Sequence, residues 1–433
     1  MKDIKKLTET FKELEEQLIT CMRCGMCQSV CPLYNETLSE TDVARGKLAI
    51  LKGVSEQFFE NIEDVNKVIN KCLLCGSCAA NCPSGVKVTD IFIKARVALI
   101  NYEGLSTAKK IIFRKVLSNP SFFNKLLSFF SKFQGVAIKK TKFDSSCFRI
   151  NIGDRKRHFP KIAPTSFYDR MKKKNRKQIS NNKKTGLKVG FYAGCILDKF
   201  FPDIAEKVVD ILEYHGAAVT LLDKTGCCGI PAIASGDLET FIKLTTLNAD
   251  LFEEYGCDYY VTACATCTST IKKTWPLVLD DQNKEISEKV KIISEKTFDI
   301  HRFITEKLSV ELPSNSGEKR GIVTYHDPCH LKKSLGIYKE PRDLIKQNPL
   351  YEFVESDKSD SCCGMGGSFN LNHYDISKKI GEKKFKNLIK TECQFIATGC
   401  PACMMQIRDV AAANKSNVKI KHSIEIYWES LNL

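Results

Sequence analysis

Apolar positions recur with two different periods along this chain of 433 residues. Between residues 3 and 20 they form a helical stripe, and helical periods return over residues 40–53, 56–72 and 88–118. From about residue 187, short apolar runs of strand length alternate with helical stretches. The pattern predicts an α/β protein with an N-terminal all-α module and small parallel sheets after it.

The strand and helix alternation after residue 187 occurs twice. The first copy has the apolar runs LKVGFY, AVTLL and DYYVTA, and the second has GIVTY, YEFVE and QFIATG. Each copy closes with a further segment, VKIISEKTFDIHRFI or VKIKHSIEIYWESL. Parallel strands joined by helices bring their carboxyl ends to one edge of a sheet, where α/β folds hold ligands. We predict two repeated modules, 187–312 and 321–433.

Both copies carry the same five-cysteine pattern at predicted strand ends and helix starts. The gaps are 31 and 35 residues in the first copy and 32 and 36 in the second. The first set is Cys195, Cys227, Cys228, Cys264 and Cys267, and the second is Cys329, Cys362, Cys363, Cys400 and Cys403. Glycines follow each cysteine pair and permit tight backbone around a large cofactor. These candidate cofactor-binding positions are Gly229, Gly364, Gly366 and Gly367.

The N-terminal part contains two runs of the form CxxCxxCxxxCP. They comprise Cys21, Cys24, Cys27 and Cys31, and Cys72, Cys75, Cys78 and Cys82. In such runs three cysteines bind one [4Fe-4S] cube and the fourth reaches the other cube. We therefore assign one cluster to Cys21, Cys24, Cys27 and Cys82, and the other to Cys72, Cys75, Cys78 and Cys31. Structural zinc, which usually takes two separated CxxC pairs, fits this spacing poorly.

Cysteine usage and net charge limit the other classes. Twenty-one cysteines in CxxC and CC clusters, without a secretory signal, favour metal binding in a reducing cytoplasm over disulfides. The formal net charge is +15, and eight basic residues without an acidic one lie in residues 170–184. We interpret that run as a solvated linker, with docking on an acidic partner or anionic lipid as the alternative. Because no nucleic-acid-binding motif accompanies it, we expect no nucleic-acid partner.

Residues 106–186 are expected to form a helical and basic connector between an N-terminal domain of residues 1–105 and the two modules. Its stretch IIFRKVLSNPSFFNKLLSFFSKF combines six phenylalanines with lysines and one arginine. We interpret it as helices packed on the cluster module or on a partner, with a basic amphipathic element on a membrane surface as the alternative. Three further cysteines, Cys147, Cys257 and Cys393, are interpreted as buried side chains rather than ligands.

These motifs resemble those of known iron–sulfur families. Residues 1 to about 105 resemble the α-helical ferredoxin domain of fumarate reductase-type iron–sulfur subunits. The repeat resembles the cysteine-rich CCG domain family, which includes heterodisulfide reductase. The segments GCCGIPAIASGD, HDPCHLKKSLGIYKEPRDLI, CCGMGGSF and TGCPACMMQI, in this domain order, look most like the glycolate oxidase iron–sulfur subunit.

The resemblance implies cofactors and partners. Each five-cysteine set would hold a further [4Fe-4S] cluster of noncubane type, with zinc as the alternative in one module. FAD would belong only to a partner dehydrogenase subunit, and a quinone or another carrier would accept the electrons. The implied function is an iron–sulfur electron-transfer subunit of an oxidoreductase acting on a 2-hydroxy acid such as glycolate or lactate, in the cytoplasm or peripherally on the inner face of the membrane.

Two other functions remain open at the level of sequence. A heterodisulfide reductase-like enzyme would reduce a disulfide or a quinone at its own CCG cluster, and a structural zinc or nucleic-acid-binding protein would be colourless. No catalytic residue is identified, but His326 and His330 bracket Cys329 and are candidates for a donor to the cluster or a proton donor to substrate. A histidine satisfied at a strand end is an equally good interpretation of each, and His373 is a weaker candidate.

Overall fold

The computed structural model divides the chain into two compact units. Unit 1 comprises Met1–Ser118, Gly229–Lys243 and Ser361–Lys383, and unit 2 comprises Asn119–Cys228, Leu244–Asp360 and Lys384–Leu433. The structure describes residues 4–59, 61–140, 146–148, 157–174, 185–280, 284–308 and 318–431. Each unit is built from three separate stretches of chain, so the two units do not correspond to the domains expected from sequence, and those domain boundaries stay predictions.

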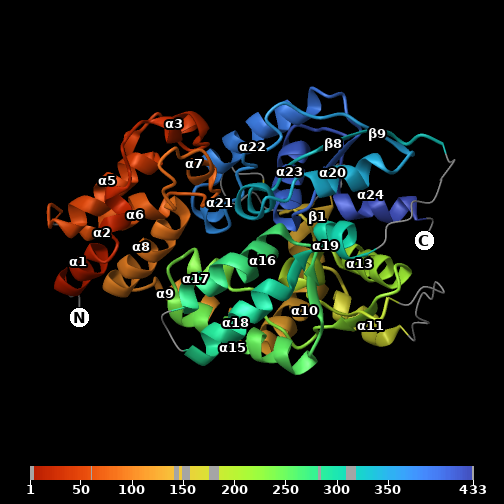
Figure 1. The fold of residues 1–433 in the computed structure, drawn as a ribbon. Coiled ribbons are helices and arrows are strands. Elements are labelled where there is room, and N and C mark those ends of the chain that lie inside the picture. The colour runs from red at the N-terminus through yellow and green to blue at the C-terminus, as the bar shows by residue number, and fades with distance from the viewer. Residues whose placement is uncertain are drawn as a thin grey trace. The chain divides into compact units, whose positions relative to one another are not determined.

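Unit 1 is helical (Figure 1). Its helices are α1 (Ile4–Lys12), α2 (Glu15–Ile19), α3 (Met26–Val30), α4 (Tyr34–Thr37), η1 (Glu40–Asp42), α5 (Ala44–Ser55), α6 (Ile62–Asn70), α7 (Ser77–Ala80), α8 (Val88–Glu103), α9 (Thr107–Lys110), η2 (Ile111–Leu117), α14 (Ile230–Ile233) and α21 (Ser368–Asn372). Helices α15 (Leu238–Tyr255) and α22 (Tyr374–Ile389) begin in this unit and end in unit 2. The all-α character expected for the N-terminal module is confirmed.

Three of the expected helices are shorter than their periods suggest. The first is divided into α1 and α2, and the period over residues 56–72 becomes helical only at Ile62, after Asn61 accepts a hydrogen bond from the backbone of Glu63. The period over residues 88–118 is interrupted after Glu103, where Gly104 has a φ of 83° and ends α8. The start of α6 is thus set by its N-cap and the end of α8 by a glycine with positive φ, and the hydrophobic period alone predicts neither.

Unit 2 contains two parallel sheets with the same strand order. The strands are β4 (Lys188–Phe191), β5 (Ala218–Leu221), β6 (Tyr259–Thr262), β7 (Thr297–Asp299), β8 (Gly321–Tyr325), β9 (Tyr351–Phe353), β10 (Phe395–Thr398) and β11 (Lys419–His422). The orders are β5-β4-β6-β7 and β9-β8-β10-β11, so each copy uses its first and third strands at the centre. The predicted repeat of small parallel sheets is confirmed.

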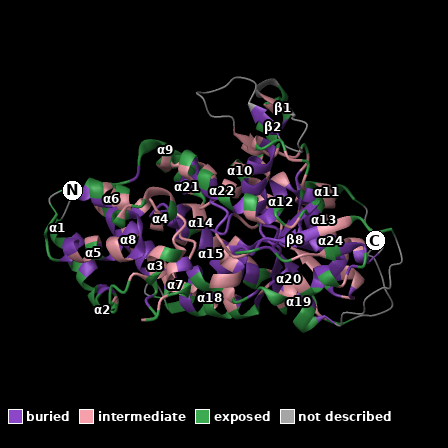
Figure 2. Ribbon diagram, turned by 90° about the horizontal axis from the view of Figure 1, so that it is seen from above, coloured by how far each residue is buried: buried purple, intermediate pink, exposed green. Residues whose placement is uncertain are grey.

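Helices cover the two sheets and join them. They are α10 (Pro120–Ala137), α11 (Phe167–Lys173), α12 (Gly194–Phe200), α13 (Pro202–Tyr214), α16 (Ala265–Ser269), η3 (Thr270–Thr274), α17 (Trp275–Leu279), α18 (Lys284–Lys296), α19 (Ile300–Lys307), η4 (His330–Ser334), α20 (Lys339–Lys346), α23 (Pro401–Ala413) and α24 (Ser423–Ser430). Helices of one copy pack on helices of the other, in the pairs α13 with α24 and α19 with α20. The central strands β6, β8 and β10 are largely buried, and the region of β8 is purple in Figure 2.

The connector contains more structure than its sequence indicates. Strands β1 (Ile138–Lys140), β2 (Ser146–Phe148) and β3 (His158–Phe159) form a small antiparallel sheet after α10. Of the basic run, residues 170–174 are described, and Arg170, Lys172 and Lys174 pair with acidic side chains of unit 2. Residues 175–184 lie outside the described part. Among described residues, no helix combines the length and apolarity needed to cross a membrane.

Candidate iron–sulfur sites

The first site of unit 1 is a cavity lined by five cysteines, of which Cys78 also lines the cavity described next. Cys21, Cys24 and Cys27 come from the loop before and within α3, and Cys82 comes from the segment after α7. Gly25 precedes α3 with a φ of 86°, which a side chain would strain, and this conformation turns the loop around the cavity. The cavity thus joins three cysteines of the first run to the last cysteine of the second.

The second site is a matching cavity lined by Cys72, Cys75, Cys78 and Cys31. Its loop passes through Gly76, whose φ is 69°, into α7. Burial raises the pKa of the Cys31 thiol to about 12 and the pKa of Cys78 well above its usual value. Thiolates at such positions require a strong positive charge beside them, which iron in a cluster supplies. This donor set fits the [4Fe-4S] group that the sequence predicts.

Two buried cations lie beside the second site, and sequence reasoning missed both. Lys47 of α5 lines the cavity, is 1% exposed and lies 3.9 Å from Asp42. Arg96 of α8 donates to the carbonyl oxygens of Ile69, Asn70 and Cys72 and, at 2.6 Å, to that of Ala234. It neutralises the C-terminal end of α6 and fixes the loop that begins at Cys72. The sequence contained one signal for them: each is a charged residue at a position where the helical period predicts a buried apolar side chain.

Unit 1 also contains the cysteine pair of the second repeat. The thiol of Cys362 is in hydrogen-bonding contact with the thiol of Cys75 at the second cavity, and contact with Cys363 and Cys75 raises the pKa of Cys362 well above its usual value. Cys362 also packs in a small apolar cluster with Leu33 and Leu73. An expected ligand of the ferredoxin-type site and an expected ligand of a CCG site are therefore in contact, although they are 287 residues apart in sequence.

The first CCG set lies entirely within unit 2. Cys195 is in α12 after β4, the pair Cys227 and Cys228 follows β5, and Cys264 and Cys267 are at the start of α16 after β6. The sulfur atoms of Cys195 and Cys227 are 3.9 Å apart, and Cys267 contacts both Cys228 and Cys264. The strand ends thus gather the five thiols as the repeat predicts, and this donor set suits a cluster of soft metal ions.

The cysteine pair is held by neutral hydrogen bonds from buried side chains. Asn248 of α15 donates to the Cys227 carbonyl oxygen at 2.9 Å and accepts from the Gly226 amide at 2.7 Å. Trp275 of α17 donates to the Cys228 carbonyl oxygen at 2.9 Å. A Cβ at Gly194, whose φ is 67°, would lie 3.0 Å from the Cys267 sulfur. Hydrogen bonds from Asn248 and Trp275, and the tight packing at Gly194, therefore hold the backbone around this site in place.

The fourth cysteines of the two five-cysteine sets are in contact. Cys264 donates to the sulfur of Cys400, and contacts from Cys264 and Cys403 lower the pKa of Cys400 well below its usual value. Thr266 bridges the repeats, because its hydroxyl lies 3.5 Å from the Cys400 sulfur and 3.2 Å from Nδ1 of His330. Candidate His330 therefore contacts the neighbouring repeat.

The second CCG set is divided by the two units. Cys329, Cys400 and Cys403 belong to unit 2, and Cys362 and Cys363 belong to unit 1. In unit 2, His326 is 1% exposed, has a ring nitrogen within 4.8 Å of the Cys403 sulfur, and its ring nitrogens have no hydrogen-bond partner among the described residues. His373 packs on Phe369 in unit 1, at some distance in sequence from any expected ligand. Of the three candidate histidines, His326 is therefore the one whose burial and position beside a cysteine sulfur best fit a group that faces a bound cluster.

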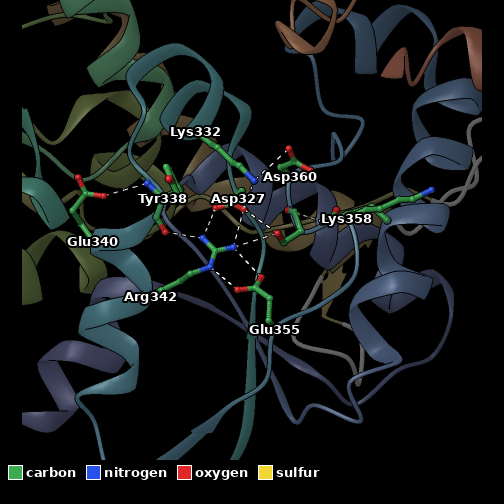
Figure 3. Close-up of polar contacts among 10 residues, drawn as sticks. Asp327, Lys332, Tyr338, Glu340, Arg342, Glu355, Lys358 and Asp360 are labelled. Atoms are coloured by element: carbon green, nitrogen blue, oxygen red, sulfur yellow. Dashed lines mark hydrogen bonds and ion pairs between the residues drawn. The ribbon is translucent and has the colours of Figure 1, made fainter. Parts of the chain in front are cut away.

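The loop before Cys329 is anchored by an ion-pair network (Figure 3). Arg342 of α20 binds both carboxylate oxygens of buried Asp327, at 2.7 and 2.8 Å, and also both of Glu355. Ser359 donates to Asp327, and Lys332 lies 3.5 Å from it. Although burial opposes ionisation, Arg342 holds the pKa of Asp327 below its usual value. The network fixes the backbone from which Cys329 extends.

The remaining site predictions are placed as follows. Gly229, Gly364, Gly366 and Gly367 all have positive φ, from 51° to 93°. A Cβ at Gly229 would lie 2.7 Å from Phe241, and one at Gly366 would meet Leu73, so both positions require close backbone approach. Cys257 and Cys393 are buried just before β6 and β10, and Cys147 is buried in β2, as expected for side chains of the core.

Two cysteine-lined cavities and a duplicated cysteine-rich α/β fold define an iron–sulfur protein of the electron-transfer class. Family models agree: residues 17–86 match the 4Fe-4S dicluster domain, and residues 189–272 and 323–408 match the cysteine-rich CCG domain. The recognition made from sequence is thereby confirmed, and the chain carries one ferredoxin-type dicluster domain and two CCG domains.

Named relatives are similar along nearly the whole chain. A probable glycolate oxidase iron–sulfur subunit of Bacillus subtilis is 28% identical over 420 residues, which cover 94% of this chain and 92% of the relative. One subunit of the CoM/CoB fumarate reductase of Methanothermobacter marburgensis is 26% identical, covering 95% and 72%. One subunit of the dihydromethanophenazine:CoB–CoM heterodisulfide reductase of Methanosarcina barkeri is 25% identical, covering 96% and 95%.

Proposed function

We propose that this chain is the iron–sulfur subunit of an FAD-linked 2-hydroxy-acid oxidoreductase of the glycolate or lactate type. A flavoprotein partner oxidises the substrate, and this chain passes the electrons singly to a quinone or another carrier. The observation that carries the proposal is the contact of Cys75 with Cys362, because it brings the ferredoxin-type site and a CCG cysteine pair together within unit 1. Iron–sulfur groups supply one-electron chemistry, and the protein sets their spacing and potentials.

The proposed ligands follow the grouping of the thiols. Cys21, Cys24, Cys27 and Cys82 would hold one [4Fe-4S] cubane, and Cys72, Cys75, Cys78 and Cys31 the other. The first CCG set would hold a third cluster. The second CCG set would hold a fourth cluster or zinc, since its cysteines satisfy either ion.

The second candidate function is a heterodisulfide reductase-like enzyme that reduces a disulfide or quinone at a CCG site. The observation that favours it is His326, which is buried near the Cys403 sulfur without a hydrogen-bond partner in the described part of the chain. A histidine so placed suits a proton donor to the thiolate or the reduced quinone that such a reduction forms.

Anaerobic purification of the native complex tests the two functions against each other. The electron-transfer subunit should elute with a flavoprotein and with roughly sixteen irons per chain, four for each cluster. A flavin-free brown protein that reduces disulfides or quinones by itself would contradict the proposal and support the second function. A colourless protein with zinc would contradict both.

A further inference from the structure

We propose that α10 is an interfacial helix that docks this chain on an anionic phospholipid bilayer. The proposal names a partner surface for the proposed electron-transfer role, and it rests on that role only in its choice of a membrane carrier as acceptor. The supporting observation is that α10 exposes phenylalanines and buries a polar side chain, whereas an ordinary surface helix buries its apolar side chains and exposes its polar ones.

The outward face of α10 is aromatic. Phe122, Phe129 and Phe133 lie on one face because they are seven and four residues apart, and they are 46%, 57% and 56% exposed. Phe130 beside them is 51% exposed. The ring centroids of Phe129 and Phe133 are 4.8 Å apart and those of Phe129 and Phe130 are 6.0 Å apart, so these three rings form one patch, with Phe122 two turns before it on the same face. Isolated exposed apolar residues need no explanation, whereas four on one helix indicate a surface that is covered in use.

The inward face of α10 is partly polar and fixed. Ser131 is buried and donates to the carbonyl oxygen of Ser128. Gln134 exchanges two hydrogen bonds with the backbone of Ile162, at 2.7 and 3.0 Å. Asn119 caps the helix by accepting from the Phe122 amide. Of these bonds, the two between Gln134 and Ile162 tie α10 to another segment, so turning the phenylalanines inward would break them.

The charge around the aromatic patch selects the partner. Lys125 and Lys132 are exposed and each stands three residues after an outward phenylalanine. Residues 119–143 contain five basic residues and no acidic one. Lysines that flank an aromatic face reach anionic headgroups while the rings enter the acyl boundary. This combination fits a phospholipid surface better than the mixed polar rim of a protein interface.

The helix is connected to the first CCG site. Pro120, its first residue, lies 3.0 Å from the position that a Cβ on Gly226 would occupy, and Gly226 directly precedes the pair Cys227 and Cys228. A membrane held at α10 therefore lies on the same unit as a complete five-cysteine set. A lipid-soluble carrier such as a quinone is the acceptor chemistry that this arrangement suits.

Vesicle flotation of the anaerobically purified, cluster-containing chain tests the proposal. The wild-type chain should float with vesicles of equal parts phosphatidylcholine and phosphatidylglycerol, and less with phosphatidylcholine alone or in high salt. The double variant Phe129→Ser with Phe133→Ser should bind about tenfold more weakly, because it loses apolar contact. Lys125→Glu with Lys132→Glu should also lose roughly tenfold, selectively for anionic vesicles.

The matched control replaces two exposed apolar residues elsewhere. Ile292→Ser with Leu371→Ser, at positions 55% and 69% exposed, should float like the wild type. Unchanged far-ultraviolet circular dichroism and cluster absorbance would establish that each variant is folded. Flotation does not depend on electron transfer, so failure of the proposed function would leave this result intact.

Three results would overturn the proposal. The wild type does not float with anionic vesicles, or it floats equally well after the α10 substitutions. The third result is that neither the wild type nor any variant binds vesicles, and the α10 substitutions instead abolish self-association or co-elution with a flavoprotein. In that case a second copy or a protein partner covers α10.

Discussion

Single cysteines decide which cluster each ferredoxin run serves. Cys82 lines the same cavity as Cys21, Cys24 and Cys27, although it belongs to the other run. We expect Cys82→Ser to change the electron paramagnetic resonance signal of one cubane and leave the other intact, because Cys82 lines the first cavity and not the second. The reciprocal variant Cys31→Ser should affect only the other signal. If either variant altered both signals equally, the proposed cross-ligation would be wrong.

Arg96 shows how one buried charge stabilises several segments. Replacing it by Met leaves the carbonyl oxygens of Ile69, Asn70, Cys72 and Ala234 without this donor. We expect Arg96→Met to lower the free energy of unfolding by about 3–5 kcal/mol, as for other broken buried charge contacts. Urea unfolding measures the loss. Lys67→Met on neighbouring α6, an exposed site, is the control that should change little, and an equally small effect at Arg96 would contradict the role assigned to it.

His422 makes unit 2 sensitive to acid. Burial and the neighbouring His301 lower the pKa of His422 to about 4, against about 6.5 in an unfolded chain. As the pH falls below about 6.5 the unfolded chain takes up a proton that the folded chain accepts only near pH 4, so stability is lost over this range.

Between pH 7 and pH 5 this loss should amount to about 2 kcal/mol. Urea unfolding at the two pH values should therefore show a smaller acid sensitivity in His422→Asn, which can still cap α24. The same pH dependence in both proteins would show that His422 does not titrate as described.

At the scale of elements, the repeat was predictable and its boundaries were not. Two matched cysteine patterns and alternating apolar runs predicted both sheets, because apolar positions recur with different periods in strands and in helices. The closing strand of the first copy was obscured: residues 290–294 belong to α18, and β7 is formed by Thr297–Asp299 instead. The small sheet β1-β2-β3 was missed because its strands are two or three residues long.

The loop between β8 and η4 depends on α20 through Arg342. We expect Arg342→Lys to lower the free energy of unfolding by about 2 kcal/mol, because lysine keeps the charge but cannot bind Asp327 and Glu355 with a planar fork. Thermal unfolding followed by circular dichroism measures the effect. Arg320→Lys, where the arginine is 47% exposed and pairs with Glu429, should be nearly neutral because Lys421 also pairs with Glu429. A stable Arg342→Lys would mean that charge alone holds the loop.

At the scale of the molecule, the sequence predicted the cofactor class but not which parts of the chain fold together. Spacing pointed to the cysteines that line the two cavities of unit 1 and to those that gather in the first CCG set, since ligand geometry imposes short local patterns. It could not predict that Cys362 contacts Cys75, or that Cys264 contacts Cys400, because such contacts depend on tertiary packing of distant segments. Arg96 and Lys47 escaped notice for the same reason, since their partners lie in other helices.

The central claim is that this chain receives electrons from a flavoprotein that oxidises a 2-hydroxy acid. The most direct test is electron paramagnetic resonance of the native complex, frozen anaerobically after addition of glycolate or lactate. Signals of reduced iron–sulfur clusters should appear with substrate when the flavoprotein is present, and not when it has been removed. If substrate produced no signal in a complex whose clusters dithionite reduces, the claim would be contradicted.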